Sequence, residues 1–100
     1  MRPSNFEINV SRANIEHAPS MVRVTFAKPG QEPGPVGDFH ILNLRAIRED
    51  KRDRTAIAGV MAVSLVEGEY GFRFRDGGEQ HIVAVEANTF EAMVDALDLH

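Results

Sequence analysis

The sequence predicts an α+β fold: an antiparallel β-sheet of five to six strands, formed by a hairpin and a three-stranded meander, with one C-terminal α-helix packed on one face. Three observations carry this prediction. Apolar and polar residues alternate with period 2 in several segments. Two glycine-containing turns connect three of those segments. The C-terminal segment has an apolar stripe with the 3.6 period of a helix. A length of 100 residues is that of a single domain, 1–100.

Composition restricts the functions that the chain can have. Apolar residues make up 43% and charged residues 26%, as in ordinary globular domains. The absence of cysteine excludes disulfides, thiolate metal sites and cysteine nucleophiles. The N-terminal segment lacks the apolar run of a signal peptide, and no segment has the ~20 apolar residues of a membrane span. We therefore expect a cytoplasmic protein that does not bind membranes. A net charge of −4 argues against nucleic acid as a general partner.

The N-terminal part of the chain is predicted to be an antiparallel hairpin. Alternating apolar residues over 5–16 indicate a first strand, and the alternation shifts near Ser11–Arg12 as it would at a β-bulge. Residues 17–20 contain proline and serine and are typical of a turn. Alternation over 22–26 indicates the second strand. The sequence leaves the register between the two strands open.

The central part of the chain is less regular. Residues 28–37 contain three prolines and three glycines, which exclude a helix and a central strand and predict a loop. A loop of this length in a small domain is either mobile or a contact surface. Residues 38–47 are predicted to be a third strand, with a helix starting at Asp38 as the alternative. Residues 45–54 are dense in charges of both signs and indicate a solvated connection or a short polar helix.

The meander is predicted over 55–66, 69–75 and 79–86. Glu67-Gly68 and Gly77-Gly78 are typical two-residue hairpin turns. Closing both turns places apolar side chains opposite one another, as strands buried on one face require. A helix over the first segment also fits the apolar spacing, but it would leave the aromatic residues of the middle strand without a paired strand. The expected pairs are Leu65–Tyr70, Val63–Phe72, Met61–Phe74, Phe74–His81, Phe72–Val83 and Tyr70–Val85.

The C-terminal helix is predicted to begin at an Asn88 N-cap, with Glu91 three residues later as in a capping box. Its apolar stripe is expected to cover the aromatic face of the meander. The expected core residues are Met61, Val63, Leu65, Tyr70, Phe72, Phe74, Val83, Val85, Phe90, Val94 and Leu97.

No catalytic or phosphate-binding motif is present, and we predict no cofactor. The serines lie outside any nucleophile-elbow pattern, and the glycines do not form a phosphate-binding loop. Asp38 and His40 would share one strand face, and together with His81 they are the combination that would suit a metal ion. We favour a surface His40 and a His81 at the rim of the core, because metal sites without a spacing motif are rare.

The candidate site is the second face of the meander, opposite the aromatic residues. This face is part apolar and part cationic, a composition that is typical of protein interfaces. A single C-terminal helix cannot cover both faces of the sheet. The alternative is that the N-terminal strands pack over the second face as another layer, and the sequence does not decide between the two. The candidate partner-binding residues are Val60, Ala62, Arg73, Arg75, Ile82 and Ala84.

These features predict a small non-catalytic protein-binding module rather than an enzyme. Its partner would be another protein or a second copy of the chain, bound at the second face or at the 28–37 loop. Adaptors, inhibitor or immunity proteins and phage or mobile-element accessory proteins are of this kind, by fold-level analogy. A first alternative is a nucleic-acid-associated accessory protein that uses residues 45–54 with Arg73 and Arg75. A second is a small ligand- or metal-binding enzyme domain.

Overall fold

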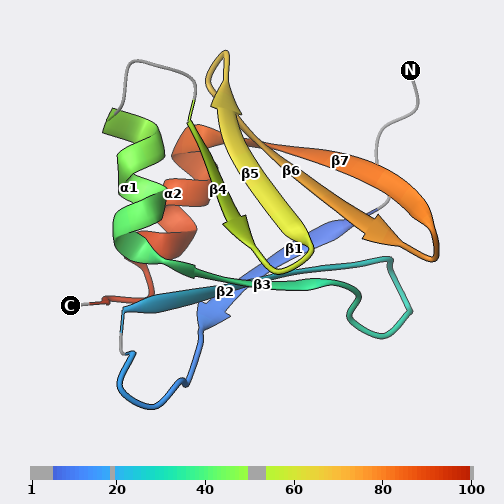
Figure 1. The fold of residues 1–100 in the computed structure, drawn as a ribbon, viewed down its shortest axis with the longest axis horizontal. Coiled ribbons are helices and arrows are strands. Elements are labelled where there is room, and N and C mark those ends of the chain that lie inside the picture. The colour runs from blue at the N-terminus through green and yellow to red at the C-terminus, as the bar shows by residue number, and fades with distance from the viewer. Residues whose placement is uncertain (1–5, 19, 50–53, 100) are drawn as a thin grey trace.

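Seven strands and two helices form the part of the chain that the computed structural model describes, residues 6–18, 20–49 and 54–99. The strands make two antiparallel sheets, a three-stranded sheet in the order β1-β2-β3 and a four-stranded sheet in the order β4-β5-β6-β7 (Figure 1). The elements in chain order are β1 (Glu7–Arg12), β2 (Met21–Ala27), β3 (Val36–His40), α1 (Ile41–Glu49), β4 (Thr55–Ala58), β5 (Met61–Val66), β6 (Glu69–Asp76), β7 (Glu79–Glu86) and α2 (Ala87–Asp95).

The prediction of one sheet of five to six strands with a single helix is therefore wrong. One cause lies in residues 38–47, which were expected to be one strand. The chain completes β3 at His40 and enters α1 at the next residue. The Leu42 backbone N–H donates to Nδ1 of His40 at 3.1 Å, so the histidine caps the helix. The apolar residues of 38–47 match neither the period of 2 of a strand nor the period of 3.6 of a helix, because the strand changes to a helix inside this segment.

The second cause lies in residues 55–66, where two strands replace the one expected. Gly59 has φ of +61°, and the chain reverses there so that Ala58 pairs with Met61. Glycine adopts this left-handed conformation without the steric cost that other residues incur. The reversal also moves Ile57 to the opposite side of the sheet from Met61: Ile57 is 75% exposed and Met61 is fully buried.

The N-terminal hairpin is confirmed. β1 and β2 pair antiparallel, from Glu7 opposite Ala27 to Arg12 opposite Val22. The pairing continues without interruption over the whole of β1, so the bulge expected near Ser11–Arg12 is absent from this ladder.

The two later turns of the meander and most of its register are also confirmed. Val66 pairs with Glu69 across the first turn, and Asp76 pairs with Glu79 across the second. Five of the six expected apolar pairs occur in the observed ladders. The sixth, Met61 with Phe74, lies one position beyond the pairing of β5 with β6, which begins at Ala62.

The C-terminal helix forms, but it begins at Ala87 and its N-cap is Glu86, not Asn88. The cap makes no side-chain hydrogen bond to the helix. Instead, the Ala87 backbone N–H donates at 2.9 Å to the carbonyl of Gly68, which lies in the turn between β5 and β6. Because the helix follows β7 directly, tertiary contact satisfies a helix N–H that a capping side chain would otherwise satisfy.

The core lies between the two sheets, on the side of the four-stranded sheet that carries Tyr70, Phe72 and Phe74, which we call the inner face. Phe26 of β2 stacks on Phe74 with ring centroids 5.0 Å apart and lies 5.3 Å from Phe72. Phe90 of α2 lies 5.0 Å from Tyr70 and 5.3 Å from Phe72. All the predicted core residues belong to this cluster, so the predicted core and the packing of α2 on the aromatic face are confirmed.

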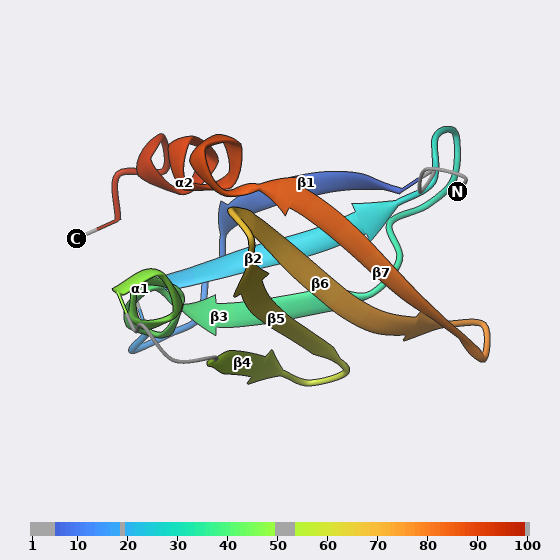
Figure 2. The ribbon, with the colours of Figure 1, turned by 90° about the horizontal axis from the view of Figure 1, so that it is seen from above.

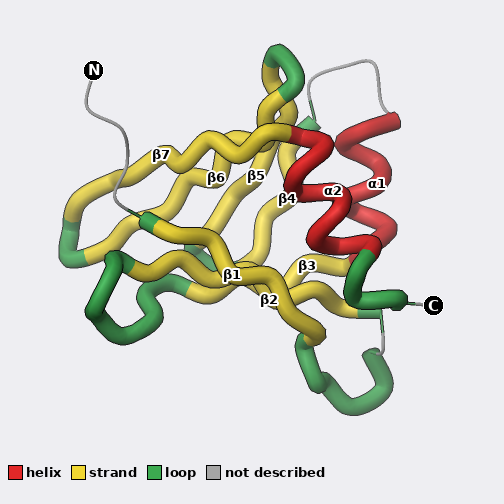
Figure 3. The backbone as a smooth tube through the Cα atoms, turned by 180° about the vertical axis from the view of Figure 1, so that it is seen from behind, coloured by secondary structure: helices red, strands yellow, loops and turns green. Residues whose placement is uncertain are grey.

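The remaining elements complete the cover of the inner face. Both helices lie at the same end of the sheets (Figure 2), beside one another (Figure 3). Helix α1 buries Ile41, Leu44 and Ile47. At Gly37 of β3, a Cβ would stand 2.9 Å from the sulfur of Met61, so a glycine permits the close approach of the two sheets.

Replacing Phe72 by alanine is expected to lower the free energy of unfolding by about 3–5 kcal/mol, because the side chain is fully buried and contacts three other aromatic rings. The matched control is Leu42→Ala, at a side chain that is 62% exposed. Urea unfolding followed by circular dichroism measures both. An unchanged unfolding midpoint for the Phe72 variant would contradict the packing described here.

Candidate functional site

The candidate residues lie on the outer face of the four-stranded sheet, the side opposite the inner face. Side chains alternate between the two faces along each strand, and the register aligns those of the outer face in four rows that cross the strands. In order along the strands, the rows are Arg75 and Gln80; Ile57, Ala62, Arg73 and Ile82; Thr55, Ser64, Gly71 and Ala84; and Val66, Glu69 and Glu86. Val60 lies in the turn between β4 and β5, beside the first two rows.

The structure brings the six predicted residues together on this face. Val60, Ala62, Arg73 and Arg75 line one shallow depression of about 410 Å³. Ile82 is paired with Arg73, and Ala84 lies two residues further along β7. The residue that the sequence missed is Ile57, which is 75% exposed and was not among the candidate residues because the turn at Gly59 was not recognised.

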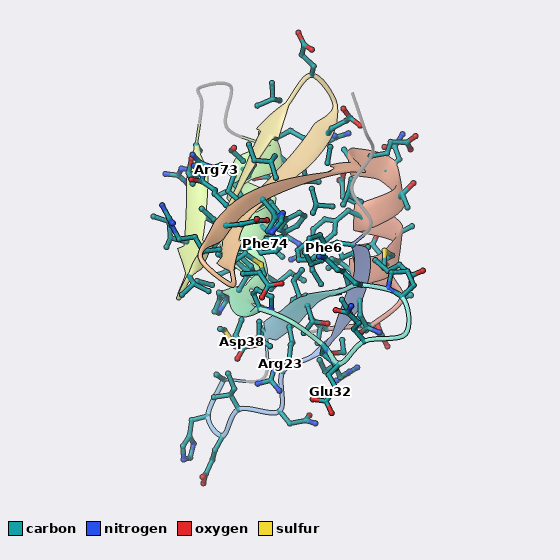
Figure 4. The ribbon with its side chains drawn as sticks, turned by 90° about the vertical axis from the view of Figure 1, so that its right-hand side faces the viewer. Phe6, Arg23, Glu32, Asp38, Arg73 and Phe74 are labelled. Carbon is teal, nitrogen blue, oxygen red and sulfur yellow. The ribbon has the colours of Figure 1, made fainter. Side chains whose placement is uncertain are left out.

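The outer face is open to solvent in the described part of the chain. The alternative that the N-terminal strands pack over it is wrong, because β1, β2 and β3 pack on the inner face. Figure 4 shows Arg73 on the side of the molecule away from the place where Phe74 meets Phe6. Among the described residues, seven large apolar side chains are exposed, and four of them belong to the outer face or its turn, namely Ile57 (75% exposed), Val60 (67%), Val66 (60%) and Ile82 (64%).

Charge is separated along the strands of the outer face. Arg73 and Arg75 lie toward one end, which we call the basic end, and Glu69 and Glu86 form the acidic end. Arg75 lies six positions along β6 from Glu69, a distance of about 20 Å in a strand. This separation exceeds the Debye length of ~8 Å at physiological salt, so the two ends do not neutralise one another.

Within the described residues, none of these four charges forms an ion pair with an opposite charge. Arg73 and Glu69 make no hydrogen bond or ion pair there, and Arg75 donates only to the Gly78 carbonyl, at 3.3 Å. Glu69 and Glu86 stand directly opposite one another on β6 and β7. Like charges in such a pair repel and destabilise the sheet. Glu86 accepts a weak hydrogen bond from Thr89 Oγ1 at 3.4 Å, which leaves its charge uncompensated.

The residues considered for a metal site have other contacts. Asp38 accepts two hydrogen bonds from Arg23, at 2.8 and 3.0 Å, and His40 caps α1. His81 packs against the rings of Phe6 and Phe74 at the edge of the core. Among the described residues, no group of three or more histidine and carboxylate side chains is placed to hold a metal ion.

The charged segment 45–54 is described only in part. Arg45, Arg48 and Glu49 belong to α1, so the first half is helical, whereas residues 50–53, including Lys51 and Arg52, lie outside the described residues. The arginines of α1 lie beside carboxylates at a groove between the two helices, and Arg73 and Arg75 line a different depression. The arginines of α1 therefore do not share a depression with those of the outer face. Arg54 lines a third depression, with Thr55, Ala56 and Ile57.

That groove is a feature that the sequence did not predict. It has a volume of about 200 Å³ and is lined by both helices and by Tyr70 of β6. Arg48 Nη1 lies 3.4 Å from Oε2 of Glu91, which is buried without a hydrogen bond. Burial of the Tyr70 phenol raises its pKa above the ordinary value of 10.0, Glu91 raises it further, and Arg48 opposes the shift. Arg48, Tyr70 and Glu91 come from separate elements that are far apart in the chain. No local sequence pattern therefore predicts that they lie close together.

The proline-rich loop is attached to the body of the molecule at two points. One is the hydrogen bond that the Gly34 backbone N–H donates to the Phe26 carbonyl at 2.8 Å, and the other is the contact of Lys28 with Phe6. Within the loop, the Gln31 N–H donates to the Lys28 carbonyl at 3.0 Å. The ammonium group of Lys28 lies 5.4 Å from the centre of the Phe6 ring. The last two residues of the predicted loop, Val36 and Gly37, belong instead to β3, which begins at Val36.

Comparisons with protein-family models, with curated proteins and with solved structures found no match, so no relative contributes to the assignment of function. Neither helix in the described part of the chain is long and apolar enough to cross a bilayer.

Tyr70 is the only tyrosine and there is no tryptophan, so the absorbance of tyrosinate reports this one group. We expect it to ionise at higher pH in the folded protein than in the urea-unfolded chain, because its folded pKa is raised. The stabilisation from this shift is complete below the unfolded pKa of about 10 and is lost as pH rises through the folded pKa. Glu91→Gln should lower the folded pKa and Arg48→Gln should raise it. Identical titrations of folded and unfolded chains would contradict this description of the groove.

Proposed function

We propose that this chain is a small non-catalytic protein-binding module and that the outer face of the four-stranded sheet is its contact surface. One observation carries the proposal. All the other described elements pack on the inner face, and the outer face with its β4–β5 turn keeps four large apolar side chains in contact with water, those of Ile57, Val60, Val66 and Ile82. Monomeric proteins rarely expose large contiguous apolar patches, and such patches commonly mark interaction sites.

The composition of the outer face supports the same proposal. Its two middle rows combine Ile57 and Ile82 with small residues, and Arg73 and Arg75 lie toward one end. Interfaces are enriched in arginine, because its long side chain combines apolar contact with several hydrogen-bond donors. A sheet face also holds these groups in fixed positions, since each strand of it is paired. A rigid surface loses little conformational entropy when a partner binds.

The proposal covers adaptors, inhibitor or immunity proteins and phage-type accessory proteins, which all act by binding. The nucleic-acid alternative has less support. The outer face carries glutamates as well as arginines, and the described arginines of α1 lie beside carboxylates. The ligand- or metal-binding enzyme alternative also has less support, because Asp38, His40 and His81 each contact other side chains or backbone in the described structure.

The double variant Arg73→Ala with Arg75→Ala tests the proposal. Both side chains are exposed, so the melting temperature should change little, as exposed substitutions usually cost no more than ~0.5 kcal/mol. Arginines at the centre of an interface contribute ~2 kcal/mol or more to binding. We therefore expect self-association in sedimentation, or capture of a partner from the source lysate, to weaken by at least about tenfold.

The matched control is Arg45→Ala, which removes an exposed arginine outside the outer face. It should bind like the unmodified chain. If the double variant stays folded and every interaction of the chain is unchanged, the outer face is not its contact surface.

A further inference from the structure

We infer that the outer face binds a second copy of this chain, in a two-fold symmetric dimer whose axis runs across the strands between the two central rows. The inference rests on the proposed function and names its partner. The two central rows are the one that contains Arg73 and the one that contains Gly71. A two-fold axis makes the same surface serve both subunits, so the face must be complementary to itself.

Charge complementarity selects the direction of the axis. If the axis crosses the strands, the basic end of each copy faces the acidic end of the other. Arg75 then stands opposite Glu69 of the second copy, and the symmetric contact repeats the pair. If the axis runs along the strands, the two basic ends meet and so do the two acidic ends. Like charges that face each other across an interface are strongly unfavourable.

The position of the axis also matches large side chains to small ones. With the axis between the central rows, Ile82 faces Ala84 of the second copy, and the side chain of Arg73 lies over Gly71. Ala62 faces Ser64, and Val60 lies near Val66 at the margin. Gly71 has no side chain and its ideal Cβ direction is open, with the nearest atom at 4.0 Å. This leaves space for the Arg73 stem to extend toward the acidic end of the second copy.

The dimer would relieve the repulsion at the acidic end. Glu69 and Glu86 of one copy stand side by side, and no cation of the described residues pairs with Glu69. An arginine from the second copy, placed between the two carboxylates, would form charge-assisted hydrogen bonds there. Face-to-face sheets pack with their strands within about 30° of one another, which is compatible with this arrangement.

The size of the face suits a reversible dimer. Four strands spaced by ~4.8 Å and four rows spanning about 20 Å give roughly 400 Å² in projection. Weak, transient complexes bury less than about 600 Å² per partner, and a face of this size falls in that class. The association should therefore depend on protein concentration and be detectable by sedimentation equilibrium.

Two charge reversals test the arrangement. Arg75→Glu and Glu69→Arg each place like charges opposite one another in the dimer, so each variant alone should associate at least tenfold more weakly than the unmodified chain. An equimolar mixture of the two restores opposite charges at both contacts. The mixture should form a heterodimer, which native mass spectrometry separates from the homodimers by mass. The variant that carries both changes should also regain the dimer.

The controls separate folding from association. Both positions are exposed, so neither variant should melt at a lower temperature in circular dichroism, and Glu69→Arg should melt slightly higher because it ends the repulsion of Glu69 by Glu86. Recovery in the mixture is possible only if both variants are folded. Glu32→Arg makes the same change on the exposed 28–35 loop and should leave the dimer intact. If the unmodified chain is still monomeric at a concentration of about 1 mM, its dimer dissociation constant is weaker than about 1 mM, and the inference is overturned.

A mixture that associates no better than its components would overturn it as well. In either case the proposed function can still hold. If Arg73→Ala with Arg75→Ala weakens capture of a different protein, then the outer face binds that protein rather than a second copy. If that double variant changes no interaction, the proposed function fails too.

Discussion

The contact of Phe26 with Phe72 and Phe74 determines how the whole molecule is arranged. These three rings are fully or almost fully buried, and they join a strand of one sheet to a strand of the other. Each large aromatic ring contributes much of the apolar area that a small domain removes from water. Because this contact fixes the three-stranded sheet against the inner face, every element attached to that sheet lies on the same side. Helix α1 follows directly from β3 and is therefore held there too.

One consequence is that the four-stranded sheet has two unequal faces. Its inner face is covered by a sheet and two helices, while its outer face has no cover from the described residues. The described elements thus form the two layers that are usual in a single domain. The apolar side chains that remain outside, such as Ile57 and Ile82, are then available to a partner. The location of the candidate site thus follows from the location of the core.

The alternation of residues in the meander was sufficient to predict both of its faces. Arg73 and Arg75 were placed on one side and Phe72 and Phe74 on the other, as the structure has them. The sequence could not decide which elements cover which face, because that depends on contacts between residues far apart in the chain. The two wrong predictions of secondary structure, over 38–47 and over 55–66, each arose from an effect of neighbouring residues. The side chain of His40 and the positive φ of Gly59 end one element and start another within a few residues, and averaging over a window conceals such changes.

The charges of the outer face have a physical role that apolar contact cannot supply. An uncovered apolar sheet face tends to associate in many registers, because apolar contact has little directional preference. Arginines at one end and glutamates at the other penalise every arrangement in which like ends meet. Gly71 between them adds a steric condition, since only one position along the strand can accept a long side chain from the opposite surface. In the proposed dimer, apolar residues would therefore provide the affinity, and the two charged ends and the central glycine would restrict it to one geometry.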